Sequence, residues 1–173
     1  MRKESIEMGL LKDIFGSKEN KIQVVAPVAG KLVPLSEVSD PTFSEEILGQ
    51  GAAVIPSENE FLSPVDGTVT TVFPTGHAVA LTSVEGVEIL LHIGLDTVKL
   101  NGKHFTIHAE EGQQVKKGDL LLEADLEQIK SEGYDIITPV VICNTEEFSE
   151  IGMVKGGSVT VGNVIINIIK RKG

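Results

Sequence analysis

Short apolar runs alternate with glycine, proline, asparagine and aspartate from Ile22 to the end of the chain. Runs of this length at close intervals are typical of strands in an all-β sandwich or barrel. Three windows fit one or two helical turns instead, namely 43–48, 126–132 and 145–150, the last with Asn144 as a candidate N-cap. We expect strands over residues 22–26, 30–34, 52–56, 61–63, 67–73, 78–82, 87–91, 106–108, 120–124, 137–142, 157–160 and 164–169.

One motif occurs twice in this pattern. Pro27-Val28-Ala29-Gly30 precedes one predicted strand, and Pro64-Val65-Asp66-Gly67 precedes another. Two copies are fewer than the three or more that a stack of repeats needs. The sequence therefore predicts a pseudo-symmetric sandwich with an internally duplicated motif.

The chain divides into a flexible N-terminal arm, residues 1–21, and a single domain, residues 22–173. Within the arm, residues 8–15 place apolar side chains at helical spacing, which fits a short amphipathic segment. Such a segment is either a frayed end, since isolated short helices are marginal in water, or a reversible membrane contact. Met8 also resembles a natural start, which makes residues 1–7 an upstream extension.

Size and charge limit the classes of function. The 173 residues suit one core, and a formal net charge of -10 argues against nucleic acid as a partner and in favour of a basic protein partner. The lone Cys143 fits a small core residue in a reducing compartment. No apolar run reaches the roughly 20 residues of a membrane span, and no secretory signal is evident, so we expect a cytoplasmic protein.

The most informative residues are His77 and His92, on adjacent predicted strands joined by residues 83–86. A four-residue loop, or a two-residue turn at 84–85, pairs them directly, with Cβ atoms about 5 Å apart on one face. A turn at 85–86 makes them diagonal neighbours on that face, whereas an odd-length loop separates them.

The same register places mostly apolar side chains around the two imidazoles. Thr75 lies two residues before His77 and is placed to fix its tautomer by a hydroxyl hydrogen bond. In an extended chain Asp96 lies about 13 Å from His92. A turn of the backbone at Gly94 brings the two residues closer. The side chains expected on the histidine face are Val79, Leu81, Glu88 and Leu90.

Two facing imidazoles in an apolar rim suit a metal site, acid–base catalysis or capture of a phosphoryl group; the alternative is a pair of structural histidines. A catalytic zinc usually takes three protein ligands, and the chain has neither a His-x-His nor a His-Glu-x-x-His motif. A phosphoryl carrier needs one ring nitrogen as nucleophile, a neighbouring N–H donor and limited access of water. The other two histidines, His104 and His108, lie in a polar stretch and are expected to be solvated or structural.

The residues around this pair resemble a known family. Thr75-Gly76-His77-Ala78, followed by residues 90–98 with the sequence Leu-Leu-His-Ile-Gly-Leu-Asp-Thr-Val, is similar to the glucose-family enzyme IIA of the bacterial phosphoenolpyruvate-dependent sugar phosphotransferase system. The likeness runs from about Ile22 to the end and includes segments 26–30, 61–68, 110–113, 138–141 and 157–162.

The resemblance implies an antiparallel β-sandwich whose shallow apolar depression holds the two histidines. It implies that His92 accepts a phosphoryl group through Nε2 from the carrier protein HPr and passes it to a IIB domain of a sugar transporter. His77 would donate a hydrogen bond to that group with Thr75 orienting it, and Asp96 would face a basic group of the partner. The apolar docking surface implied by the family consists of Phe43, Ile47, Leu48, Phe73, Leu90 and Val98.

The resemblance requires neither a metal nor another cofactor. It also suggests transient contact of residues 8–15 with the inner face of the membrane, and regulatory target proteins as further partners. Three rivals share parts of the pattern: a zinc endopeptidase of related architecture, a biotinyl or lipoyl carrier domain, and a regulatory docking protein of the same fold. The transported sugar does not follow from this chain, because the membrane-bound IIC partner selects it.

Overall fold

The computed structural model describes residues 21–171; the predicted arm, including its amphipathic segment, lies outside them except for Lys21, which begins the first strand. Every strand pair in this part of the chain is antiparallel, which confirms the predicted all-β class. The strands are β1 (Lys21–Val25), β2 (Gly30–Val33), β3 (Gln50–Pro56), β4 (Glu60–Leu62), β5 (Gly67–Val72), β6 (Ala78–Ser83), β7 (Glu88–His92), β8 (Phe105–Ile107), β9 (Gln114–Val115), β10 (Leu120–Ala124), β11 (Thr138–Ile142), β12 (Phe148–Met153), β13 (Gly157–Val159) and β14 (Val164–Lys170). The helical turns are η1 (Leu35–Glu37), α2 (Pro41–Ser44), η2 (Thr97–Leu100), α3 (Leu126–Ser131) and η3 (Thr145–Glu147).

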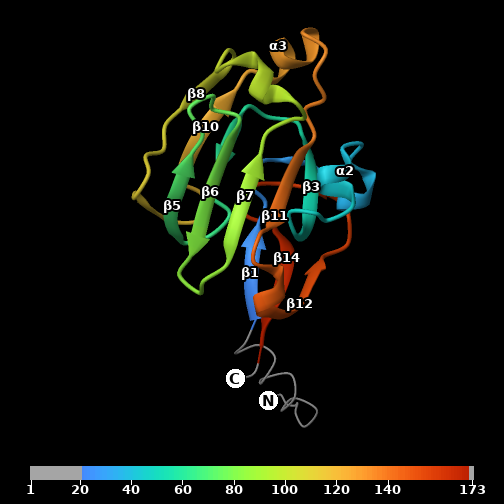
Figure 1. Ribbon diagram of the computed structural model, residues 1–173, viewed down its shortest axis with the longest axis vertical. Helices are drawn as coiled ribbons and strands as arrows, with labels where there is room; N and C mark the ends of the chain where they lie inside the picture. The colour runs from blue at the N-terminus through green and yellow to red at the C-terminus, as the bar shows by residue number, and fades with distance from the viewer. Residues whose placement is uncertain (1–20, 172–173) are drawn as a thin grey trace.

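An eight-stranded sheet of order β13-β2-β3-β11-β7-β6-β5-β9 forms one layer. Two three-stranded sheets, β1-β14-β12 and β4-β10-β8, supply the rest of the sandwich (Figure 1). Fully buried side chains such as Phe61, Leu91 and Ile165 belong to one continuous core cluster. The core therefore covers the inner face of the large sheet and leaves its outer face available for other contacts.

The duplicated motif has a direct structural meaning. Gly30 begins β2 and pairs with Pro56, while Gly67 begins β5 and pairs with Ser83. A Cβ atom on either glycine would lie 2.1 Å from a carbonyl oxygen of the paired strand, so both copies need glycine for the same close approach. The predicted duplication is thus two equivalent turn-strand units.

The equivalence extends across the whole eight-stranded sheet. Counted inwards from the two edges, its strands correspond in pairs: β13 to β9, β2 to β5, β3 to β6 and β11 to β7. The pseudo-twofold axis passes between Leu91 and Val140, which pair with each other at the centre. By these registers the corresponding pairs of residues are His92 and Val141, His77 and Gln50, Ile93 and Ile142, and Gly94 and Cys143.

The two halves differ on the outer face. The chain between β2 and β3 folds over the β3–β11 half, where it buries Leu35, Val38 and Phe43 against Ala53 and Val141. In Figure 1 this segment, with α2, lies beside β3 and leaves β5, β6 and β7 uncovered. The outer face of the β5–β6–β7 half is therefore not covered by the segment between β2 and β3.

Several local predictions are wrong. The expected helix over 145–150 is a short turn followed by the strand β12, which pairs with β14 and thereby overrides the helical pattern. Asn144 does not cap that turn, because its side chain accepts a hydrogen bond from Glu88 N at 2.9 Å and donates one to Gly86 O. Cys143 is exposed, since β11 ends one residue earlier. Strand β9 was also missed, being two residues long.

Among residues 21–171, no helix is long and apolar enough to span a membrane.

Candidate functional site

The two histidines meet at the end of β6 and β7, although the predicted register is wrong by one residue. Thr82 pairs with Glu88, and a three-residue loop ending at Gly86 (φ +93°) connects the strands, so the loop has the odd length that was expected to separate the rings. His92 consequently pairs with Ala78 instead of His77. The imidazole centroids nevertheless lie 5.0 Å apart, with the rings at 82°.

The rings meet because His77 precedes the regular part of β6. Gly76 turns the chain with φ +73°, and the His77 carbonyl accepts a hydrogen bond from Ile93 N at 2.7 Å. Strict alternation of side chains therefore does not apply at this position. The one-residue shift also moves Val79 and Leu81 to the core, where both are fully buried, and leaves Ala78 and Ala80 opposite His92 and Leu90.

Gly94 fixes the tautomer of His92. The Nδ1 atom of His92 lies 2.8 Å from the carbonyl oxygen of Gly94, and a carbonyl only accepts hydrogen bonds. Nδ1 therefore carries the proton, and Nε2 keeps its lone pair. The predicted turn at Gly94 is confirmed: its φ is +80°, and an added Cβ would lie 2.7 Å from Thr97 Cγ2.

Thr75 holds the second imidazole, as predicted. Its Oγ1 lies 2.7 Å from Nδ1 of His77. When the hydroxyl donates this hydrogen bond, the ring proton is on Nε2 and is available to a bound anion. The ring centroids of Phe73 and His77 lie 5.5 Å apart, and those of Phe43 and His92 lie 5.0 Å apart. An aromatic side chain therefore packs against each imidazole.

Burial keeps both rings neutral at neutral pH. Desolvation, and after it the neighbouring His92, lowers the pKa of His77 from 6.5 to about 4. Desolvation also lowers the pKa of His92, while the Gly94 hydrogen bond, Asp40 and Asp96 act in the opposite direction. A neutral imidazole with a free nitrogen is a competent nucleophile.

Two carboxylates lie close enough to influence His92. Asp96 reaches the site because Gly94 turns the chain and Asp96 itself adopts φ +61°. Asp40 was missed by the sequence analysis; it caps α2, and its side chain accepts a hydrogen bond from Thr42 N at 3.0 Å. The Asp40-Pro41 pair is a recognisable helix start, but its proximity to His92 depends on tertiary packing.

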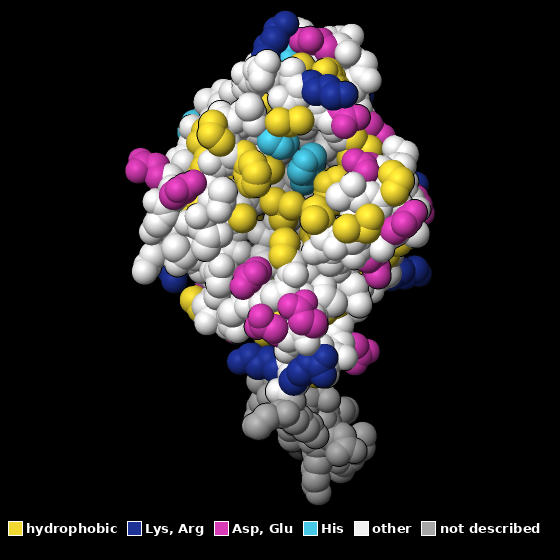
Figure 2. Space-filling model, viewed as in Figure 1, with side chains coloured by type: hydrophobic (Ala, Val, Ile, Leu, Met, Phe, Trp, Pro, Cys, Tyr) yellow, Lys and Arg dark blue, Asp and Glu magenta, His cyan; other side chains and the backbone are white. Residues whose placement is uncertain are grey.

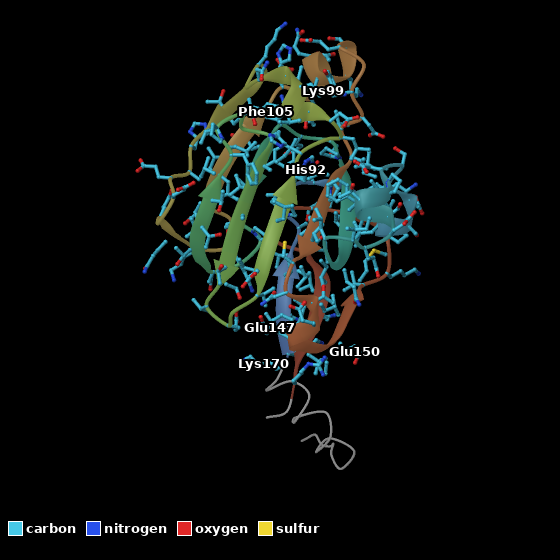
Figure 3. All side chains as sticks on the ribbon, viewed as in Figure 1. His92, Lys99, Phe105, Glu147, Glu150 and Lys170 are labelled. Carbon is cyan, nitrogen blue, oxygen red and sulfur yellow. The ribbon has the colours of Figure 1, made fainter. Side chains whose placement is uncertain are left out.

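Apolar side chains surround the imidazoles on the surface (Figure 2). Ile47, Leu48 and Val98 are exposed, and Phe73 and Leu90 are partly buried, so all five are available to a partner. Phe43 differs from its prediction, because only 4% of it is exposed and it supports His92 from below the surface. Figure 3 shows the labelled His92 in the upper half of the molecule, away from Lys170 near the chain end.

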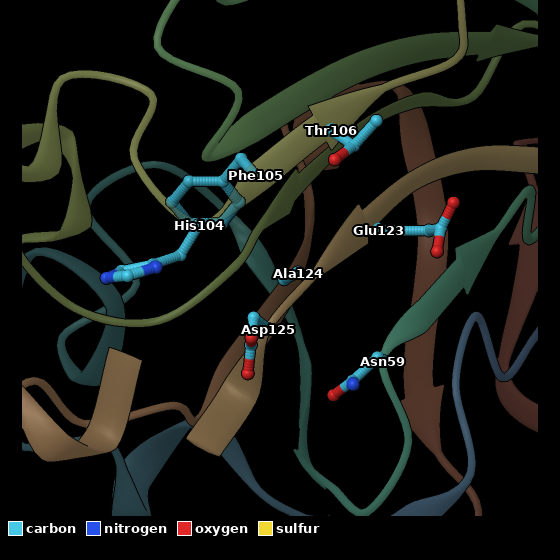
Figure 4. Close-up of a pocket in the computed structure, with 7 residues that line it drawn as sticks. All are labelled: Asn59, His104, Phe105, Thr106, Glu123, Ala124 and Asp125. Atoms are coloured by element: carbon cyan, nitrogen blue, oxygen red, sulfur yellow. The ribbon is translucent and has the colours of Figure 1, made fainter. Parts of the chain in front are cut away.

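The other two histidines are structural, as expected. His104 Nε2 contacts the Glu132 carboxylate, and His108 Nε2 lies 2.6 Å from Glu123. A polar pocket of about 370 Å³ lies beside His104 and Glu123 (Figure 4). It is lined by Asn59, His104, Phe105, Thr106, Glu123, Ala124 and Asp125.

The geometry suits transfer of an electrophilic group to His92. One ring presents a lone pair, the adjacent ring presents an N–H, and the surrounding side chains are apolar. Within residues 21–171, no group of three histidine, cysteine, aspartate or glutamate side chains is arranged to bind a metal.

Comparison with known proteins agrees with this arrangement. Residues 22–148 match the model of the phosphoenolpyruvate-dependent sugar phosphotransferase system, EIIA 1 family. A glucose-specific EIIA component from Haemophilus influenzae is 43% identical over 167 residues, which cover 95% of this chain and 100% of that protein. The beta-glucoside-specific EIIBCA component of Bacillus subtilis is 53% identical over 135 residues, which cover 75% of this chain and 22% of that protein.

A solved structure gives the same answer for the fold. Glucose permease IIA from Mycoplasma capricolum superimposes with a TM-score of 0.80 at 39% identity, covering 85% of this chain and 95% of that one. This structure is therefore similar to the chain in sequence as well as in its antiparallel sandwich fold. The chain therefore belongs to the EIIA 1 family of the sugar phosphotransferase system, as a phosphotransferase component that relays phosphoryl groups.

Proposed function

We propose that His92 is the phosphoryl carrier and reacts through Nε2. The observation that supports this assignment is the hydrogen bond from His92 Nδ1 to Gly94 O, which leaves the Nε2 lone pair free beside a second imidazole. His77 has its own Nδ1 engaged by Thr75 and stands in the position of a hydrogen-bond donor. The two rings thus divide the roles of nucleophile and electrostatic support.

The donor in this proposal is the phosphohistidine of HPr, and the acceptor is a IIB domain of a sugar permease. In the first step a P–N bond forms at His92 Nε2 while the donor's P–N bond breaks, and its electron pair returns to the donor imidazole. The proton on Nδ1 stays in the hydrogen bond to Gly94. The second step repeats this exchange with the IIB nucleophile, so positioning supplies most of the catalysis.

His77 and its neighbours stabilise the transferred group. Its Nε2–H donates to a phosphoryl oxygen when Thr75 donates to Nδ1. Asp96 and Asp40 sit beside the phosphoryl site, and a basic side chain of the partner neutralises them during docking. The exposed apolar side chains Ile47, Leu48 and Val98 exclude water from the contact.

The choice of IIB as acceptor is supported by the relatives in which EIIA is part of a longer EIIBCA protein. We further propose that residues 22–173 are sufficient for the relay. All the groups named above lie within this range, so the arm of residues 1–21, including any membrane contact of residues 8–15, serves location and not transfer.

Intact mass after incubation with phosphoenolpyruvate, enzyme I and HPr tests the proposal. Wild type and a variant lacking residues 1–20 should each gain one acid-labile phosphoryl group, and His92→Ala should gain none. His77→Gln should accept the group but transfer it to IIB at least tenfold more slowly, because its donor is altered. His108→Ala is the matched control, since His108 is exposed and paired with Glu123.

Two results would contradict the assignment. An adduct on His92→Ala places the carrier elsewhere in the chain. Wild-type transfer by His77→Gln shows that the second imidazole has no part in the onward step.

A further inference from the structure

Thr97 is a fully buried polar residue directly beneath the site. It has 0% exposure, and its hydroxyl donates a hydrogen bond to the carbonyl oxygen of Ile93 at 2.6 Å. Its methyl group lies against Gly94, where an added Cβ would come within 2.7 Å of Thr97 Cγ2. The side chain therefore touches both residues that follow His92 in the chain.

The peptide groups it touches lead to both imidazoles. Ile93 N donates to the carbonyl of His77 at 2.7 Å, while Ile93 O accepts from Thr97. The next carbonyl, that of Gly94, accepts from His92 Nδ1. The Thr97 hydroxyl is thus connected through Ile93 to the His77 carbonyl by two hydrogen bonds. It also lies next to Gly94, whose carbonyl accepts the hydrogen bond from His92.

Asp135, from the connection that precedes β11, supports the same turn. Its carbonyl oxygen accepts from Leu95 N at 3.0 Å and would lie 2.9 Å from a Cβ on Gly94. Its own side chain accepts from Ile137 N at 2.9 Å, which fixes the local turn. Two residues therefore hold the turn at Gly94: Asp135 acts through its backbone carbonyl, and Thr97 acts through its side chain.

The other half of the sheet contains the same device without the histidines. Thr145 donates to the carbonyl of Ile142 at 2.7 Å, and Ile142 is the pseudo-twofold equivalent of Ile93. Thr145 also accepts from Gln50 N at 2.9 Å, and Gln50 is the equivalent of His77. The hydrogen bond from threonine to the end of the central strand is therefore a structural element of both halves, and only one half has an imidazole that depends on it.

We propose that Thr97 is a positioning residue for phosphoryl transfer: its hydrogen bond to Ile93 and its contact with Gly94 set the direction of the Gly94 carbonyl and so fix the His92 tautomer. This inference rests on the proposed role of His92 as the carrier. It adds a buried residue that never touches the phosphoryl group. Without the hydroxyl, the turn at Gly94 keeps only its hydrogen bond from Leu95 N to Asp135 O, so the direction of the Gly94 carbonyl is less closely fixed and His92 Nε2 no longer keeps its lone pair in every molecule.

Three variants test the role: Thr97→Val removes the hydroxyl at constant shape, Thr97→Ser retains it, and Thr145→Val removes the threonine hydrogen bond to Ile142 in the other half. Nitrogen-15 NMR of unphosphorylated protein reads the His92 tautomer and its pKa directly. Thr97→Val should show a mixture of tautomers and a further lowered His92 pKa, because the Gly94 hydrogen bond raises it. Its rate of phosphoryl acceptance should fall about tenfold, with Thr97→Ser within about threefold of wild type.

Thr145→Val should lose stability while its His92 tautomer and acceptance rate stay as in wild type. The proposal is overturned if Thr97→Val keeps a pure Nδ1–H tautomer and a wild-type rate, or if Thr145→Val changes the tautomer equally. Because the NMR measurement needs no phosphoryl donor, it gives its answer even if His92 proves not to be the carrier.

Discussion

The two halves of the eight-stranded sheet share strand order and matching registers, yet only one carries imidazoles on its outer face. Val141 occupies the place of His92 and is fully buried, and Gln50 occupies the place of His77. The covered half keeps its outer face dry under Leu35, Val38 and Phe43. The same backbone thus supports a packed layer in one half and a reactive depression in the other.

The difference lies in the connections and only secondarily in the strands. Residues 34–49 link β2 to β3 and cover their half, whereas the equivalent link between β5 and β6 is a short turn at residues 73–77. Phe43 is the last buried side chain of this long link, and its ring contacts His92. A long loop in one copy therefore supplies both the lid of the packed half and one wall of the site.

Exchanging the equivalent residues is the severest test of this comparison. Val141→His places an imidazole among the buried apolar side chains of the covering segment, and we expect a loss of about 3 kcal/mol in the free energy of unfolding. His92→Val should retain wild-type stability within about 1 kcal/mol and lose phosphoryl acceptance completely. Urea denaturation and intact mass measure the two effects, and a phosphorylated Val141→His/His92→Val double variant would show that the covering segment does not matter.

The position after the central strand gives an effect of intermediate size. Gly94→Ala forces a methyl group against Asp135 O and a left-handed φ of +80°, so we expect a loss of about 2 kcal/mol in stability. Displacement of the Gly94 carbonyl should slow phosphoryl acceptance by more than tenfold. Cys143→Ala changes the equivalent residue, which is exposed, and should leave both quantities unchanged. Equal effects of the two changes would mean that the turns after β7 and β11 serve the same purpose.

The smallest expected effect concerns pH. Burial holds the pKa of His77 at about 4, below the value of 6.5 for an unperturbed histidine, so the unfolded chain binds the additional proton between these values. Stability should therefore fall as pH drops from 6.5 towards 4. His77→Gln, which introduces the residue type of the other half, should reduce the loss between pH 7 and pH 5 by about 1 kcal/mol, allowing for solvent screening. Identical pH dependence in both proteins would assign the acid sensitivity to other groups.

The sequence was a good guide to the strands and to the proximity of the two histidines, although they do not pair directly across the strands. Most predicted strand boundaries agree with the structure to within two residues, because apolar runs bounded by glycine and proline carry that information locally. The register failed by one residue at the loop before Val87, where Gly86 permits a three-residue connection. His77 still reaches His92, because it lies in a turn and not in the strand.

The residues that the sequence did not identify depend on contacts between distant segments. Asp40 and Asp135 approach the site from two other connections, and no local pattern places them there. Thr97 lies only five residues after His92, but its hydrogen bond back to Ile93 depends on the turn at Gly94, which the alternation of strand residues does not show. The first residues of β12 fall in the window 145–150 that was predicted as helix, and pairing with β14 extends them instead. Propensity gives way to tertiary contacts in these places.

The antiparallel pairing of β1 with β14 brings the two ends of the described chain to one pole, with Lys21 opposite Ile169. His92 lies at a distance from that pole, in the other half of the molecule (Figure 3). A tether at either end therefore leaves the reactive surface free to turn towards a second protein, and a short flexible tether supplies an effective concentration in the millimolar range. In the Bacillus subtilis relative the matched region forms 22% of a longer chain. A separate unit and a tethered unit then differ in their local concentration near the second protein, while the chemistry at the two imidazoles is the same.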